Sequence, residues 1–135
     1  MLSLLPCAFV APAPAQAEDV SVTNDASNLQ ASYAAAQLRA AMVRRKHVIV
    51  DAGHPGSFPI VLSIRSGELA SQAYAIEALP GSVTVTGGDG RGLIYGTLAL
   101  VEQLDKGRSI RKLQSASEKP AVAFRAIKFD LPWDS

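Results

Sequence analysis

The chain has 135 residues and a formal net charge of +1, and 48% of its residues are hydrophobic. This length fits one domain, and the hydrophobic fraction is high enough for a packed core and excludes a disordered chain. The near-neutral charge provides neither a basic surface for nucleic acid nor an acidic tail, and no apolar run reaches the roughly 18 residues of a membrane span. We therefore expect no nucleic-acid partner and no membrane partner.

The first 17 residues have the composition of an export signal. The apolar run from Met1 to Val10 is followed by a Pro- and Ala-rich stretch that ends in Ala15-Gln16-Ala17. Small residues at these positions fit signal peptidase, so we expect cleavage after Ala17 and export to the periplasm or the extracellular space. The usual basic start is missing, so the leader begins upstream or is unusual; a Pro/Ala-rich arm is the alternative. Cys7 would leave with the leader, and with it all thiol chemistry.

A short strand and a long helix are expected next. The residues from Asp19 to Thr23 alternate between apolar and polar and predict a strand. The stretch from Leu29 to Lys46 lacks Gly and Pro and predicts a helix, with Ser27 or Asn28 as its N-cap. One face of this helix is the expected core stripe, made of Ala31, Ala34, Ala35, Leu38, Ala41 and Met42. A second apolar face lies nearly opposite, which indicates a helix covered on two sides: Leu29, Tyr33, Ala36, Ala40 and Val43.

Four further strands follow in the middle of the chain. The apolar runs predict strands over His47–Asp51, Ile60–Ile64, Ala73–Ala78 and Ser82–Thr86, with loops over 52–57 and 66–71. The last two of these strands are joined by Leu79-Pro80-Gly81. Proline and glycine supply turn dihedral angles, so this pair reads as a hairpin.

A glycine-rich turn, a second helix and a last strand complete the chain. After Gly87, Gly88 and Gly90 we expect a helix from about Arg91 to Leu104, which Gly107 ends. One face of this helix should pack on the sheet: Leu93, Gly96, Thr97, Leu100 and Leu104. Residues 108–121 are polar and read as a linker, and Val122–Leu131 alternates and reads as a final strand. The fold class is therefore α+β, a mixed sheet with two helices packed on it.

The glycine-rich turn has two readings. The glycines from Gly90 to Gly96 follow a strand and open a helix, which is the placement of a dinucleotide-binding loop. However, the preceding strand is half polar, no second apolar strand closes the unit, and no acidic residue follows about 20 residues later. The favoured reading is structural: a tight turn, with Gly92 and Gly96 letting the helix lie close to the sheet.

Two other groups of polar residues have candidate and structural readings. Asp51 and His54 are types used in metal or acid–base sites, but His47 is the only other histidine and no third ligand has a suitable spacing, so a loop histidine beside a turn aspartate is favoured. The run from Arg44 to Lys46 ends a predicted helix, where cations complement the helix dipole. We expect no catalytic residue, no metal and no cofactor in this chain.

The order of these motifs resembles a known module. The sequence Arg91-Gly92-Leu93-Ile94-Tyr95-Gly96, followed by Leu100 and Leu104, is similar to the end of the N-terminal α+β domain of glycoside hydrolases of families 20 and 67 (β-N-acetylhexosaminidases and α-glucuronidases). The segment from Phe124 to Asp130 resembles the entry to the first strand of their (β/α)8 barrel. Family 20 enzymes usually carry an arginine three residues after this aspartate. Here that position is Trp133, so a uronic-acid-directed relative stays open beside a hexosaminidase.

The resemblance implies a division of the chain and a role for it. Residues 1–17 would be the signal peptide, 18–107 the accessory domain, 108–121 the linker and 122–135 the start of the truncated catalytic barrel. Asp130 and Trp133 are tentative substrate-binding residues. The chain would be the non-catalytic N-terminal domain of an exported glycoside hydrolase acting on carbohydrate polymers or oligosaccharides, with its own barrel as partner and no activity alone. A free-standing exported module for a sugar or small ligand is the alternative; a dinucleotide-binding domain is a third.

Overall fold

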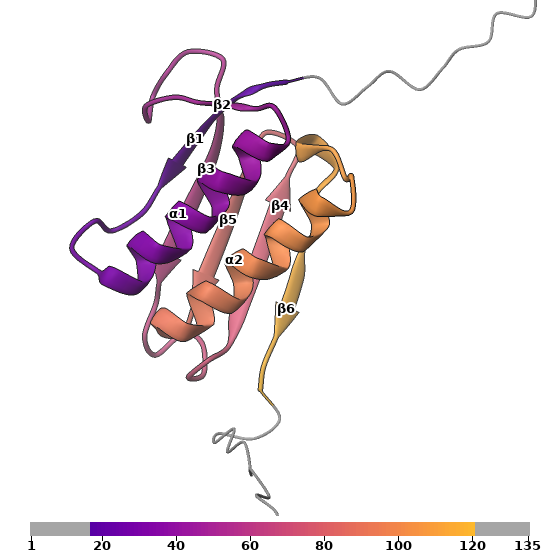
Figure 1. Cartoon of the computed structure of the whole chain (residues 1–135). Helices are drawn as coiled ribbons and strands as arrows, with labels where there is room; N and C mark the ends of the chain where they lie inside the picture. Colours follow the sequence, from indigo (N-terminus) through magenta and orange to yellow (C-terminus); the bar gives the residue numbers. More distant parts are fainter. Residues whose placement is uncertain (1–16, 121–135) are drawn as a thin grey trace, which may run out of the picture.

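The computed structural model describes residues 17–120, which form a single sheet with two helices on one face (Figure 1). The elements in chain order are β1 (Asp19–Thr23), α1 (Leu29–Arg44), β2 (Val48–Ile49), β3 (Phe58–Ile64), β4 (Tyr74–Leu79), β5 (Ser82–Gly87), α2 (Gly90–Asp105), a 3-10 turn η1 (Ile110–Lys112) and β6 (Ala116–Glu118). The prediction of an α+β fold with a mixed sheet and two helices is confirmed. The expected strand Val122–Leu131 lies outside the described residues.

The sheet has six strands in the order β2-β1-β3-β5-β4-β6. Strands β2, β1, β3 and β5 are mutually parallel, whereas β4 pairs antiparallel with β5 on one side and with β6 on the other. The β4–β5 hairpin is confirmed, with Leu79 opposite Ser82 across the turn. Its Gly81 does not adopt a positive φ, so the turn does not depend on the freedom of glycine.

The hydrophobic core lies between the sheet and the two helices. The predicted core stripe of α1 is buried in full, and Asn28 caps this helix by accepting the Ala31 N–H at 2.9 Å. The predicted face of α2 is also buried, and Gly107 follows the helix with a φ of 91°. Strands contribute alternate residues to this layer, such as Val83 and Val85 of β5, while Thr84 and Thr86 point to the other face.

The segment after α2 contains more structure than its polar sequence indicated. The polar sequence of residues 108–121 has no clear period and reads as a linker, yet η1 and β6 both fall within this segment. The η1 turn buries Ile110, and Arg111 Nε donates to Glu18 Oε1 at 2.6 Å beside the first strand. Strand β6 is short and exposed, so periodicity could not reveal it, and it is held by backbone pairing with β4.

Candidate functional site

The glycine-rich turn closes the N-terminal end of α2 against a neighbouring loop. Asp89 is the N-cap, and its Oδ1 accepts the Gly92 N–H at 2.7 Å. Its Oδ2 accepts the Ser71 hydroxyl at 2.7 Å and the Gln72 N–H at 3.1 Å. One carboxylate therefore satisfies the helix end and anchors the loop before β4. A phosphate at this helix end would meet the Asp89 carboxylate, which argues against the dinucleotide reading.

The pKa of Asp89 reflects these contacts. Partial burial acts to raise the pKa, but the hydrogen bonds from Gly92, Ser71 and Gln72, together with the charge of Arg91, outweigh it and hold the pKa below its ordinary value of 3.8. The Asp89 side chain is therefore an ionised structural anchor at neutral pH.

The glycines of this turn are required by contacts with neighbouring backbone. A Cβ at Gly88 would overlap the Ala70 carbonyl oxygen, and a Cβ at Gly92 would overlap the Ala73 carbonyl oxygen. At Gly96 a Cβ would lie 2.9 Å from both Tyr74 Cβ and Val85 Cγ1. The expected close approach of α2 to the sheet is confirmed. None of these glycines has a positive φ, so the need for glycine comes from space and not from dihedral angles.

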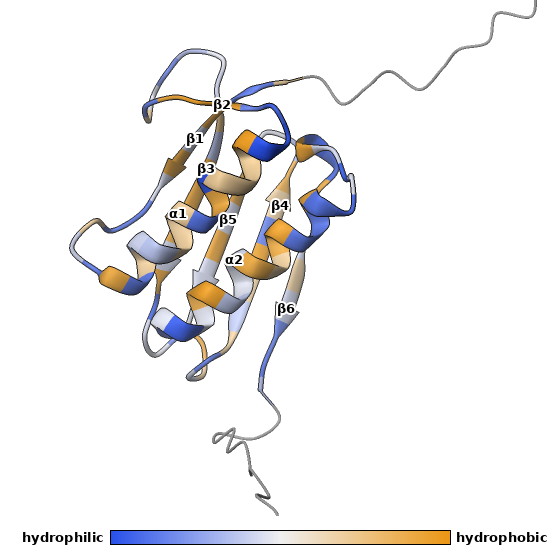
Figure 2. Cartoon of the chain, in the orientation of Figure 1, coloured by the Kyte–Doolittle hydropathy of each residue, from blue (hydrophilic) through white to orange (hydrophobic). Residues whose placement is uncertain are grey.

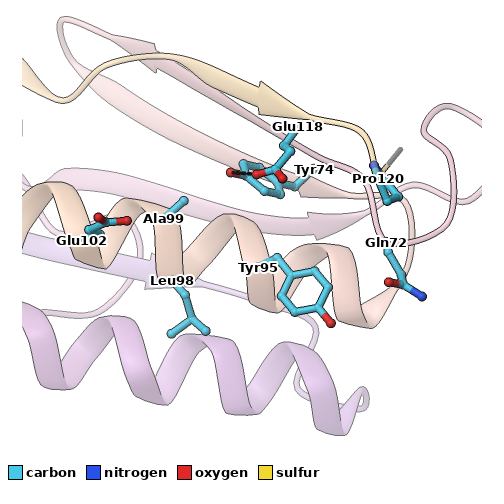
Figure 3. Close-up of a pocket in the computed structure, with 8 residues that line it drawn as sticks. All are labelled: Gln72, Tyr74, Tyr95, Leu98, Ala99, Glu102, Glu118 and Pro120. Carbon is cyan, nitrogen blue, oxygen red and sulfur yellow. Dashed lines mark hydrogen bonds between the residues drawn. The ribbon is translucent and has the colours of Figure 1, made fainter. Parts of the chain in front are cut away.

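A groove runs between α2 and the β4–β6 edge of the sheet (Figure 3). It has a volume of about 290 Å³. Tyrosines, carboxylates and an amide dominate its lining, with Leu98 as an apolar contribution: Gln72, Tyr74, Tyr95, Leu98, Glu102 and Glu118. No motif or spacing in the sequence groups these residues. Tyr95 and Leu98 lie off the core stripe of α2, and apolar residues in that position indicate a second surface on the helix. The sequence does not show that β6, which is distant in the chain, forms the other wall of the groove.

Polar contacts hold three side chains of the groove in place. The Tyr74 hydroxyl donates to Glu118 Oε2 at 3.2 Å, and Glu102 Oε1 lies 3.0 Å from Lys106 Nζ. Burial raises the pKa of Tyr74 above 10.0, and the hydrogen bond to Glu118 and the charges of Glu118 and Glu102 act in the same direction. The phenol is therefore a proton donor at neutral pH.

The two histidines make contacts that support the fold. His47 is buried, and its Nδ1 accepts the Glu18 N–H at 3.1 Å. His54 lies in an exposed loop with Nδ1 4.0 Å from Asp19 Oδ2, and its backbone N–H donates to the Asp51 carbonyl oxygen at 3.2 Å. Among residues 17–120 no group of three or more His, Cys, Asp or Glu side chains is arranged to hold a metal ion.

The basic run ends α1 as expected from the helix dipole. Arg44 is the last residue of the helix and forms a 3.5 Å ion pair with Asp105 of α2. Both partners are about half exposed, so this pair adds little to stability. Lys46 follows with a φ of 69° and turns the chain toward β2.

The second apolar face of α1 remains uncovered in the described part of the molecule. Leu29 is 87% exposed, Tyr33 52% and Val43 60%, and Ala36 and Ala40 are exposed between them. We call these five residues the outer face of α1. This face points away from the sheet, and in Figure 2 the ribbon of α1 carries orange and tan residues interspersed with blue ones. Within residues 17–120 no element covers this face, so the expected second cover of the helix stays a prediction.

The tentative substrate-binding residues Asp130 and Trp133 lie outside the described residues, so their role stays a prediction. Neither described helix is long and apolar enough to cross a membrane.

Comparisons with known proteins agree with the fold and the motifs. A sequence model described as glycosyl hydrolase family 20, domain 2, matches residues 10–117. The structure is similar to a GH138 enzyme targeting pectin rhamnogalacturonan II, with a TM-score of 0.63 and 23% identity over 76% of this chain. It is also matched to a glycoside hydrolase family 20 β-N-acetylglucosaminidase, with a TM-score of 0.39 and 31% identity over 67% of this chain. The chain spans 15% and 18% of the lengths of these two proteins. No curated protein matches it.

Proposed function

Because this chain belongs to the family of domain 2 of the family 20 glycosyl hydrolases, we propose that it is the non-catalytic N-terminal domain of an exported glycoside hydrolase, in which it supports the catalytic barrel. The resemblance to a glycoside hydrolase accessory domain is thereby confirmed. Export, the barrel partner and action on carbohydrate polymers or oligosaccharides belong to the proposal. Export is supported by the apolar leader that ends in Ala15-Gln16-Ala17.

The outer face of α1 is the observation that carries the proposed supporting role. Exposure of five apolar residues to water is unfavourable in free energy, and burial against a partner would remove this cost. Such a patch is typical of an interaction surface. The face is rigid, because the opposite side of the same helix packs on the sheet through Leu38 and Met42. The GH138 enzyme of similar fold carries most of its chain outside the matched part, which supports an intramolecular partner.

The proposal predicts that a charge on the outer face of α1 weakens the parent enzyme and not the isolated domain. Val43→Lys places an ammonium group in the proposed contact and should lower the temperature of half-inactivation of the parent enzyme, since an apolar contact of about 1–2 kcal/mol is lost. The unfolding temperature of the 135-residue chain should stay unchanged, because Val43 is 60% exposed there. Thermal inactivation of the enzyme and calorimetry of the chain measure the two effects.

A matched control lies on the other side of the sheet. Val61 of β3 is 39% exposed, and it lies opposite Thr84 of β5 on the face without helices. Val61→Lys should leave the parent enzyme as stable as the unmodified one. Equal losses for Val43→Lys and Val61→Lys, or no loss for either, would contradict docking through α1.

A further inference from the structure

We propose that the groove between α2 and the β4–β6 edge binds a neutral sugar. The inference rests on the proposed role in a carbohydrate enzyme, and it concerns a surface separate from the outer face of α1. It assigns this domain a direct contact with carbohydrate in addition to a supporting role.

The groove follows from the geometry of the two layers. Packed helices are about 10 Å apart and neighbouring strands about 4.8 Å apart, so two helices cover about four strands. The sheet has six strands. Helix α1 packs on β1, β2 and β3, and α2 packs mainly on β4 and β5. Among residues 17–120 the flank of α2 beside β6 therefore stays open, and its volume of about 290 Å³ suits one or two sugar rings.

The lining of the groove combines the groups that recognise sugars. A sugar ring has an apolar face of C–H groups and a rim of hydroxyls, which aromatic rings and carboxylate or amide oxygens respectively complement. Tyr74 and Tyr95 come from the two opposite walls, β4 and α2, and Leu98 extends the apolar wall. Tyr95 is 39% exposed and Leu98 is 42% exposed, so both side chains reach the groove surface.

The side chains of the groove are held by the fold. Gly96 lets α2 approach β4 at Tyr74, which sets the distance between the two walls. Gln72 has a φ of 62°, unusual for a residue with a side chain, and Asp89 fixes it by accepting its N–H. Glu118 is oriented by the Tyr74 hydroxyl. Such fixed groups lose little conformational freedom when a ligand binds.

The charges of the groove select against acidic sugars. Glu102 and Glu118 are the charged residues of its lining, and no lysine or arginine is among the described residues that line it. Lys106, just outside the lining, forms an ion pair with Glu102 at 3.0 Å. A uronic acid would bring a third carboxylate into the same space, where like charges repel. A neutral sugar instead presents hydroxyl donors to both carboxylates.

Titration of the 135-residue chain with defined trisaccharides tests the site. Maltotriose, cellotriose and N,N′,N″-triacetylchitotriose are the neutral probes and trigalacturonic acid is the acidic probe, with amide NMR shifts as the measurement. At least one neutral probe should shift the amides of Gln72, Tyr95 and Glu118 at millimolar concentration, and trigalacturonic acid should not. Absence of shifts with all neutral probes, or stronger binding of trigalacturonic acid, would overturn the proposal.

Variants assign the binding to the groove. Tyr95→Ala should weaken the neutral probe about tenfold, since a stacking ring contributes about 1 kcal/mol or more. Tyr33→Ala is the matched control, because this half-exposed tyrosine lies on the outer face of α1. Glu102→Gln against the exposed control Glu77→Gln provides a second pair that leaves folding intact. Equal affinities within both pairs would exclude the groove, while the docking test with Val43 would be unaffected.

Discussion

At the scale of single residues, Asp89 explains why a glycine-rich turn contains one carboxylate. The glycines let the chain pass close to the backbone of residues 70–73, and the carboxylate provides acceptors for the N–H groups that meet there. A phosphate-binding loop leaves such N–H groups to its ligand. Here the Asp89 carboxylate takes the place of such a ligand, and the turn connects α2 to the loop before β4.

Removing the Asp89 carboxylate should destabilise the domain. Asp89→Ala loses the helix cap and two loop contacts, so the free energy of unfolding should fall by about 2 kcal/mol in urea denaturation. Asp89→Asn keeps a capping oxygen and should lose less. Because the folded-state pKa is below 3.8, the charge stabilises the fold fully above that pH, and this contribution disappears as the pH falls through the folded pKa. The advantage of the unmodified chain over Asp89→Asn should therefore shrink below about pH 4. A pH-independent difference would contradict this role.

Thr97 differs from Asp89, because its polar side-chain atom is buried without a hydrogen bond in the described part of the chain. Its side chain is fully buried in α2, and within residues 17–120 its Oγ1 has no hydrogen-bond partner. Thr97→Val replaces the hydroxyl by a methyl group of similar size and should raise the free energy of unfolding by about 1 kcal/mol. Thr97→Ser, which keeps the hydroxyl and removes the methyl, should lower it by a similar amount. A destabilised valine variant would mean that the hydroxyl has a partner.

At the scale of elements, the packing of α2 on the sheet depends on the absence of side chains at two positions. Gly92 faces the Ala73 carbonyl and Gly96 faces Tyr74 and Val85. A helix usually gains about 1 kcal/mol when glycine becomes alanine. In α2 this gain is smaller than the cost of moving rigid backbone.

Gly92→Ala should therefore lower the free energy of unfolding by about 2 kcal/mol in spite of its better helix propensity. Gly81→Ala is the control, since a Cβ there has nothing within 4 Å and its φ is not positive. Its stability should change by less than about 0.5 kcal/mol. Similar denaturation midpoints for the two variants would show that α2 does not rest on the Ala73 backbone.

The elements also show which features a sequence can reveal. Both helices, the hairpin and the core stripes were predicted, because apolar spacing and turn residues are local signals. The strand expected over His47–Asp51 is reduced to Val48–Ile49. The His47 N–H bonds back to the Met42 carbonyl oxygen of α1 at 3.0 Å, and after Val50, whose N–H donates to the Val20 carbonyl oxygen at 2.9 Å, the chain turns away from β1. The groove could not be predicted, because it joins Tyr74, Tyr95 and Glu118 through β6, whose three exposed residues have no periodic pattern.

At the scale of the whole molecule, the domain has two surfaces of different character. The outer face of α1 is apolar and its side chains are exposed, which suits a permanent partner within one polypeptide. The groove beside α2 contains hydroxyl, amide and carboxylate groups, which suits a hydrated ligand that exchanges with solvent. The two are on different helices, so binding at one does not require the other to be vacant.

The two edge strands have a consequence for how the domain behaves in solution. Strand β2 has two residues and β6 has three, and Pro120 closely follows β6 and has no N–H to donate. An edge this short offers few unpaired backbone groups to the strand of another molecule. Within residues 17–120 these two edges are therefore poorly suited to growth of the sheet by strand addition, and concentrated solutions of the domain should not form cross-β aggregates through them.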